Sequence, residues 1–160
     1  MEASFGGEVD EAFPSAAFDI KEAGNCLAVE CNVAAVYHAM RAVEFGLRVI
    51  ARDRRITFPK GPVEVQQWGE ILRELEKSVA TIQQWPKGTA KEAAHEFYNK
   101  ALLEIRSFND AYRRHVMHSR AKQYDRYEAL SVVEKVERFM KLLATKISER
   151  KRTPLIWKRP

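Results

Sequence analysis

Long hydrophobic runs are missing from this sequence: no apolar stretch approaches the roughly 18 residues that a membrane-spanning helix needs. The first residues, MEASFGGEVDEAF, are acidic, so the basic start typical of a signal peptide is missing as well. We therefore expect a cytoplasmic protein that has no membrane partner.

Cysteine is equally scarce. The two cysteines, Cys26 and Cys31, are too few for a disulfide framework or a zinc site. We expect two small thiols that are buried or half-buried. The sequence predicts no metal and no cofactor.

The composition is typical of a folded globular protein. The chain has 160 residues, of which 46% are hydrophobic, and three tryptophans, which fit one domain with a core of its own. The net charge is +5, with acidic residues concentrated in residues 1–30 and basic residues later in the chain. A basic surplus of this size permits nucleic-acid binding without requiring it.

Apolar residues recur at three- and four-residue steps, which indicates helices, and no stretch alternates as a strand does. We predict an all-α fold, an up-and-down bundle of four long helices plus a short N-terminal helix that begins after Ser15. The long helices are expected within 33–55, 65–85, 90–118 and 126–148. The expected domain limits are 1–13 for a flexible N-terminus, 14–148 for the helical domain and 149–160 for a basic C-terminal tail.

The first long segment has the clearest pattern. Arg41, Glu44 and Arg48 lie on its charged face, where we expect Glu44 to pair with one of the arginines rather than to face a cleft. Its apolar stripe, expected to face the core, consists of Val33, Val36, Tyr37, Met40, Val43, Leu47 and Ile50. Similar stripes in the later segments include Trp68, Phe108, Tyr112 and Leu130.

The stretch FNDAYRRHVMHSR, residues 108–120, gathers three arginines and two of the four histidines. A metal site is its first interpretation, since His115 and His118 lie about 60° apart on an ideal helix and can share a cation. Repulsion from Arg113 and Arg114 counts against it. A third ligand also has to come from elsewhere: His95, His38, Glu44 or a cysteine. The first two of these are better explained as partly buried histidines satisfied by their neighbours.

A solvated cationic helix end is the second interpretation. Basic residues near a helix C-terminus are favoured by the helix dipole, by about 0.3–1 kcal/mol each. Asp110 lies one turn earlier and can pair with Arg113 or Arg114. This interpretation accounts for the arginines and leaves the histidines unexplained.

Acid–base chemistry on RNA is the third interpretation. A histidine can give and take protons near neutral pH, and an arginine offers a planar fork of donors to phosphate oxygens. Together they suit phosphodiester cleavage without a metal, in which histidine assists attack by the ribose 2′-OH and arginine stabilises the charge on the phosphoryl oxygens.

The spacing of the motif restricts this chemistry. Arg113 and His118 are about 140° apart on an ideal α-helix, whereas Arg114 and His118 share a face. Arg113 and His118 converge only if the helix ends or bends near Met117, or if two chains bring their motifs together across a two-fold axis. A symmetric dimer also supplies a second histidine to the same cleft.

Arg113, four further residues and His118, at the end of a long helix in a small all-α domain, resemble the Rx4-6H motif of the HEPN superfamily. The segments 32–51 and 115–144 are similar to the long helix, the motif end and the last helix of bacterial HEPN-like proteins. The resemblance covers roughly residues 14–148. It implies a helical bundle that forms a homodimer with its motifs facing each other.

Many members of that superfamily are metal-independent endoribonucleases in toxin–antitoxin, phage-defence or RNA-processing systems. The resemblance therefore implies RNA as substrate and an antitoxin or defence-system protein as a further partner. Other members have lost activity and serve as binding or regulatory modules. The alternative for this chain is thus a non-catalytic HEPN-like module that binds nucleotide, RNA or protein through the same basic cleft.

By residue, Arg113 and His118 match the motif and are expected to be catalytic, the arginine stabilising the transition state and the histidine acting as acid or base. Arg114 departs from the family, which often has asparagine at this position. The residues expected to bind substrate are Arg114, His115 and Arg120, and those expected to support the motif are Asp110 and Asn109.

Overall fold

The structure is a computed structural model that describes residues 4–113 and 123–150 of the chain. These residues are mainly helical, and no strand occurs among them, so the all-α prediction is confirmed. The α-helices are α1 (Gly7–Ala12), α2 (Ala17–Ala28), α3 (Asn32–Asp53), α4 (Trp68–Ala80), α5 (Thr89–Phe108) and α7 (Arg126–Ala144). Shorter elements are the 3₁₀ helices η1 (Pro14–Ala16), η2 (Val63–Val65) and η3 (Thr81–Gln84) and the π-helix η4 (Asn109–Arg113).

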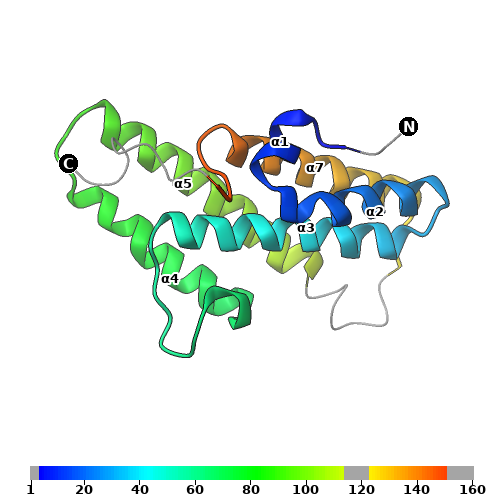
Figure 1. Ribbon diagram of the computed structural model, residues 1–160, viewed down its shortest axis with the longest axis horizontal. Coiled ribbons are helices and arrows are strands. Elements are labelled where there is room, and N and C mark those ends of the chain that lie inside the picture. Colours follow the sequence, from blue (N-terminus) through cyan, green and yellow to red (C-terminus); the bar gives the residue numbers. More distant parts are fainter. Residues whose placement is uncertain (1–3, 114–122, 151–160) are drawn as a thin grey trace.

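Helix α3 lies along the long axis of the molecule, and α2 and α7 pack most extensively on it (Figure 1). Helix α2 runs antiparallel to α3, because the amide of Cys31 donates to the carbonyl of Cys26 at their turn and His38 contacts Asp19 further along. Helix α7 runs parallel to α3: Glu30 pairs with Arg126 near one end of the two helices.

Gly46 marks the close approach of α3 and α7 near their other end. A Cβ atom on Gly46 would lie 2.8 Å from a Leu143 methyl carbon and 3.2 Å from the Met140 sulfur. Both neighbours are buried, so little space exists for them to move. The crossing therefore depends on the absence of a side chain at this position.

Helices α4 and α5 form an antiparallel pair that extends to the other end of the molecule (Figure 1). Arg106 of α5 binds Glu76 of α4, and the Tyr98 hydroxyl donates to Asp53 at the end of α3. Since Tyr98, in the middle of α5, contacts the end of α3, the rest of α5 runs back along α3 and the chain returns at η4 to the middle of α3, near Glu44. This return places the first part of the predicted motif beside the charged face of α3.

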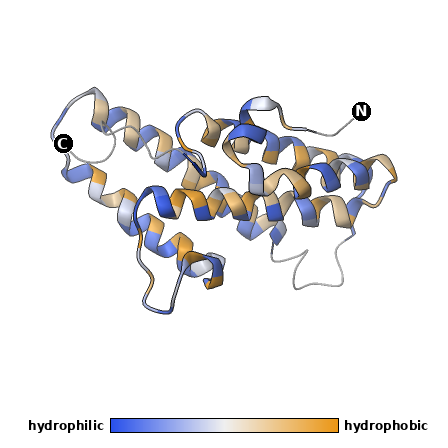
Figure 2. Ribbon diagram, in the orientation of Figure 1, coloured by the Kyte–Doolittle hydropathy of each residue, from blue (hydrophilic) through white to orange (hydrophobic). Residues whose placement is uncertain are grey.

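Each helix carries both apolar and polar residues along its length (Figure 2). Most of the apolar stripes predicted from the sequence are buried. In α3 the stripe is buried from Val36 onward, apart from Tyr37. Val33, Tyr37 and Leu130 are 44%, 38% and 42% exposed, so the prediction that they face the core is wrong. Within the described part of the chain, no helix covers this side of the first turns of α3 and α7.

The structure differs from the flexible N-terminus expected for residues 1–13. Residues of this segment form α1, and Phe5, Val9 and Phe13 are buried in the common core. The acidic composition of the segment conceals this apolar set, which a short helix gathers on one side.

The expected cap at Ser15 is also wrong. Ser15 lies within η1, and its amide and hydroxyl both donate to the carboxylate of Glu149. The amide of Glu149 donates to the carbonyl of Ala12 at 2.9 Å. The first residue of the expected tail is thus part of the folded unit, while residues 151–160 lie outside the described part of the chain.

No helix within residues 4–113 and 123–150 is both long enough and apolar enough to cross a membrane.

Candidate functional site

The described part of the motif begins where α5 stops being an α-helix. The α-helix ends at Phe108, and residues Asn109–Arg113 form the π-helix η4. The expectation of one continuous α-helix is therefore wrong for residues 109–113. Residues 114–118, over which the angle between Arg113 and His118 is defined, lie outside the described part of the chain. A π-helix closes backbone hydrogen bonds between residues i and i+5, so its turn is wider than that of the preceding α-helix.

The core holds η4 in place through two aromatic residues. The Phe108 ring lies against Phe139 of α7 with 5.5 Å between ring centroids, and against Tyr112 with 6.4 Å. The Tyr112 hydroxyl accepts a hydrogen bond from Lys135 of α7 at 3.0 Å. These contacts attach both ends of the π-turn to the last helix.

Arg113 lies over the first residue of α4. Its guanidinium carbon is 4.9 Å from the centroid of the Trp68 ring, a cation–π distance. Burial lowers the pKa of Arg113 and the nearby charge of Glu44 raises it, and an arginine in this situation stays protonated near neutral pH. No ion pair joins Arg113 and Asp110 among the described residues, and Arg114, the other partner expected for Asp110, lies outside them.

Glu44 is the carboxylate nearest to this arrangement, and both of its oxygens are occupied. Oε2 accepts from Arg41 at 2.7 Å and Oε1 accepts from Arg48 at 2.7 Å. The predicted pairing of Glu44 with α3 arginines is therefore confirmed, with both of them at once. Arg48 also donates to the carbonyl of Glu64, which ties η2 to α3.

The charges in this cluster do not cancel. Arg41, Arg48 and Arg113 surround Glu44, and among the described residues no other acidic side chain binds these three guanidiniums. Arg113 offers five N–H donors and makes no hydrogen bond within the described part of the chain. A half-buried guanidinium that has a ring beneath it and no acceptor is suited to bind an oxyanion.

Two buried donors add to this arrangement. The Nε1 group of Trp68 and the Nε group of Arg48 have no hydrogen-bond partner within the described residues, although Trp68 is only 2% exposed. Trp68 was predicted as a core residue, which is confirmed. Its contact with Arg113 could not be predicted from the sequence, because the two residues are far apart in the chain.

The remaining motif residues are placed only in part. The Asn109 amide donates to Asp110 at 3.4 Å, a long contact between two neighbours, and the supporting role expected for this pair stays a prediction. The other predicted site residues lie outside the described part of the chain: Arg114, His115, His118 and Arg120.

The two histidines outside the motif are satisfied by neighbours, as predicted. Nδ1 of His38 lies 2.8 Å from a carboxylate oxygen of Asp19, and His95 bonds to Gln83. Cys26 and Cys31 are free thiols, one half-buried and the other exposed, so burial is confirmed only for Cys26. Within the described residues no three potential ligands gather in a way that could hold a metal ion.

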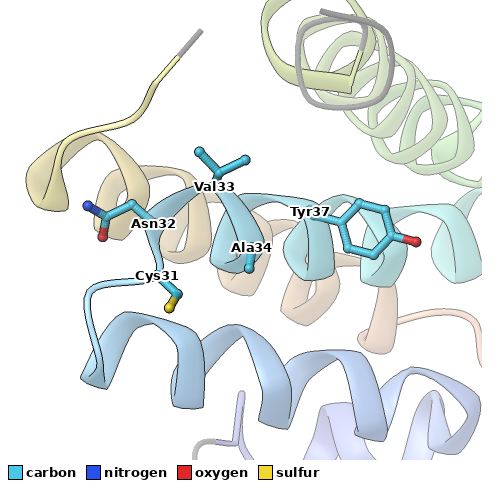
Figure 3. A pocket seen from close by; sticks show the side chains of 5 residues that line it. All are labelled: Cys31, Asn32, Val33, Ala34 and Tyr37. Atoms are coloured by element: carbon cyan, nitrogen blue, oxygen red, sulfur yellow. The ribbon is translucent and has the colours of Figure 1, made fainter. Parts of the chain in front are cut away.

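An open pocket of about 550 Å³ lies at the beginning of α3 (Figure 3). Its lining is mainly apolar and comes from Cys31, Asn32, Val33, Ala34 and Tyr37. None of these residues was predicted as a site residue. Tyr37 was assigned to the core by its spacing, and its exposure follows from the uncovered first turns of α3.

Comparison with known proteins gives no relative: no family model matches the chain, no curated protein matches it, and no solved structure matches its fold.

Proposed function

We propose that this protein is a metal-independent endoribonuclease of the HEPN type that works as a homodimer in the cytoplasm. The observation that carries the proposal is the Arg113 guanidinium, held on Trp68 at the end of α5 with no hydrogen-bond acceptor among the described residues. An arginine in this state is suited to stabilise charge that develops on a phosphoryl group. The four long helices α3, α4, α5 and α7 are compatible with a HEPN-like bundle.

In the proposed reaction His118 removes the proton from a ribose 2′-OH, and the 2′ oxygen attacks the adjacent phosphorus. The bond from phosphorus to the 5′ oxygen breaks, and that oxygen leaves with a proton from a second acid. Arg113 stabilises the negative charge on the phosphoryl oxygens. The products are a 2′,3′-cyclic phosphate and a 5′-hydroxyl, and the second acid is best supplied by His118 of a second copy.

The decisive experiment is incubation of purified protein with mixed tRNA and messenger RNA in excess EDTA. Chelation silences most contaminating nucleases, which depend on metals. We expect the parent to release fragments with 2′,3′-cyclic or 3′-phosphate ends and His118→Ala to release none. His95→Ala is the matched control. His95 lies in the first half of α5, away from the motif, and bonds to Gln83 of η3, so this variant should cleave like the parent.

A non-catalytic binding module is the second candidate. It is favoured by the same contact, since stacking on Trp68 gives Arg113 a role that needs no chemistry. Both candidates bind RNA in a salt-dependent way, and only the first yields fragments. Intact RNA with the parent protein, together with retained RNA binding, would select this second function, with RNA or a protein such as an antitoxin as partner.

A further inference from the structure

One face of α3 carries a line of side chains that points from the pocket toward Arg113. Tyr37, Arg41, Glu44 and Arg48 follow one another at steps of three and four residues, so they lie on one side of the helix. Tyr37 lines the pocket at one end of this line, and Arg48 contacts η2 at the other. Because η4 packs on α3 and Arg113 lies near Glu44, the line leads to the Arg113 guanidinium.

Arg41 is held much as Arg113 is held. Its Nη1 group donates to Glu44 at 2.7 Å, and its guanidinium carbon lies 5.6 Å from the centroid of the Phe45 ring. The side chain remains about one-third exposed (33%), and its other donors have no partner among the described residues. A guanidinium fixed by a carboxylate and an aromatic ring loses little freedom when it binds a phosphate.

The pocket offers what a nucleobase needs. Val33 and Ala34 give the lining apolar side chains, and the half-exposed Tyr37 ring, which extends along α3 away from Val33 in Figure 3, gives an aromatic surface. Bases of single-stranded RNA stack on such rings regardless of their sequence. Tyr37 and Arg41 are four residues apart on the helix, about 6 Å along its axis, which suits a base and the phosphate of the same nucleotide.

We propose that this face of α3 binds one nucleotide of single-stranded RNA, with its base on Tyr37 and its phosphate on Arg41, and that Arg113 takes the neighbouring phosphate. The charge of the cluster fits this ligand, since three guanidiniums face one carboxylate that is already saturated. Glu44 acts as a positioning residue that fixes Arg41 and Arg48. The inference rests on the proposed function for the identity of the ligand, and it adds a substrate subsite outside the motif.

The test measures binding apart from cleavage. A fluorescent oligonucleotide with 2′-O-methyl groups cannot be cleaved, because the attacking hydroxyl is blocked, and its affinity is read from anisotropy between 50 and 200 mM salt. Over this fourfold range of salt, each phosphate contact changes the affinity by a factor of about three. The variants are Arg41→Gln and Tyr37→Ala, and the matched controls are Arg73→Gln on α4 and Tyr127→Ala on α7, both exposed in the parent.

We expect Arg41→Gln to weaken binding roughly tenfold at the lowest salt and to reduce the slope of log affinity against log salt by about 0.7. Tyr37→Ala should weaken binding about tenfold without changing the slope, and only when the oligonucleotide carries bases rather than abasic sites. Arg41→Lys keeps the charge and the partner of Glu44, so it should keep the slope and lose only part of the affinity. Circular dichroism confirms that each variant is folded.

The outcomes separate the two proposals. If Arg41→Gln and Tyr37→Ala bind as tightly as their controls, the α3 subsite is wrong, while EDTA-resistant cleavage that needs His118 still supports the ribonuclease. If both variants lose affinity but the parent never cleaves RNA, the subsite stands and the protein is a binding module. A parent that does not bind the oligonucleotide at all overturns the subsite directly.

Discussion

The guanidinium of Arg113 lies 4.9 Å from the centroid of the Trp68 ring, which links the π-helical end of α5 to the first residue of α4. This contact orders the last described turn before the histidines of the motif. It also covers one face of an otherwise buried ring. The position of the charged group thus depends on packing in a part of the chain far from the motif.

Trp68 provides the first prediction. Trp68→Phe should lower the free energy of unfolding by less than about 2 kcal/mol, because a ring still fills the site and the Trp68 Nε1 group has no hydrogen bond to lose within the described residues. Trp68→Leu should cost about 3 kcal/mol or more, since it leaves a cavity and removes the cation–π contact. Urea unfolding of both variants measures the difference, and equal costs would contradict the contact with Arg113.

Glu44 provides the second prediction. Glu44→Gln leaves Arg41, Arg48 and Arg113 without their common carboxylate in a largely buried setting, so the free energy of unfolding should fall by about 2–4 kcal/mol. Glu134→Gln, on an exposed position of α7, is the control and should change it by less than about 0.5 kcal/mol. Chemical denaturation of both variants measures these changes in the free energy of unfolding. A Glu44 variant as stable as the control would mean that the arginines do not need this acid.

Gly46 provides the third prediction. Gly46→Ala gains helix propensity but places a methyl group against Leu143 and Met140, so the free energy of unfolding should fall by about 1–2 kcal/mol. Gly69 is a matched helical glycine that has no atom near its Cβ position. Gly69→Ala should leave stability unchanged or raise it by up to about 1 kcal/mol. If thermal unfolding shows Gly46→Ala to be more stable than Gly69→Ala, the α3–α7 crossing has space for a methyl group at position 46.

Tyr98 provides a prediction about pH. Burial, together with the charge of Asp53, raises the pKa of the Tyr98 phenol well above its ordinary value near 10. The unfolded chain then releases this proton at lower pH than the folded chain does. The contribution of the protonated Tyr98 phenol to the free energy of unfolding is therefore complete below about pH 10. It declines as the pH rises toward the pKa that the phenol has in the folded protein.

The measurement is the free energy of unfolding between about pH 9 and 11.5, around the ordinary phenol pKa, for the parent and for Tyr98→Phe. The free energy of unfolding of Tyr98→Phe should fall less steeply with pH than that of the parent, because the variant has no phenol to ionise at this position. Tyr127→Phe, which changes a tyrosine that is 82% exposed, should keep the decline of the parent. Parallel pH curves for the parent and the Tyr98 variant would refute the assignment.

The helices could be predicted from the sequence because their apolar residues recur at helical spacing and most of them pack inward. Three misplaced residues, Val33, Tyr37 and Leu130, follow the same spacing, and their exposure depends on how far neighbouring helices extend. Spacing alone carries no information about that extent. Helix α1 was missed because a six-residue segment is too short to produce a clear period among acidic residues.

The site was predictable only where it is local. The pairing of Glu44 with Arg41 and Arg48 follows from spacings of three and four residues on one helix. The change to a π-turn at Asn109 and the contact between Arg113 and Trp68 depend on tertiary packing, which no local pattern encodes. The roles expected for His118 and its neighbours stay predictions, because those residues lie outside the described part of the chain.

The parallel arrangement of α3 and α7 has a consequence for synthesis on the ribosome. Helix α3 can pair with α2 as soon as both have emerged, because only a short turn separates them. Its second apolar neighbour, which meets Gly46 at Leu143, is made only after α4 and α5. During that interval the middle of α3 is an unprotected apolar surface, so translation speed and chaperone access after α5 should govern how much of the nascent chain escapes aggregation.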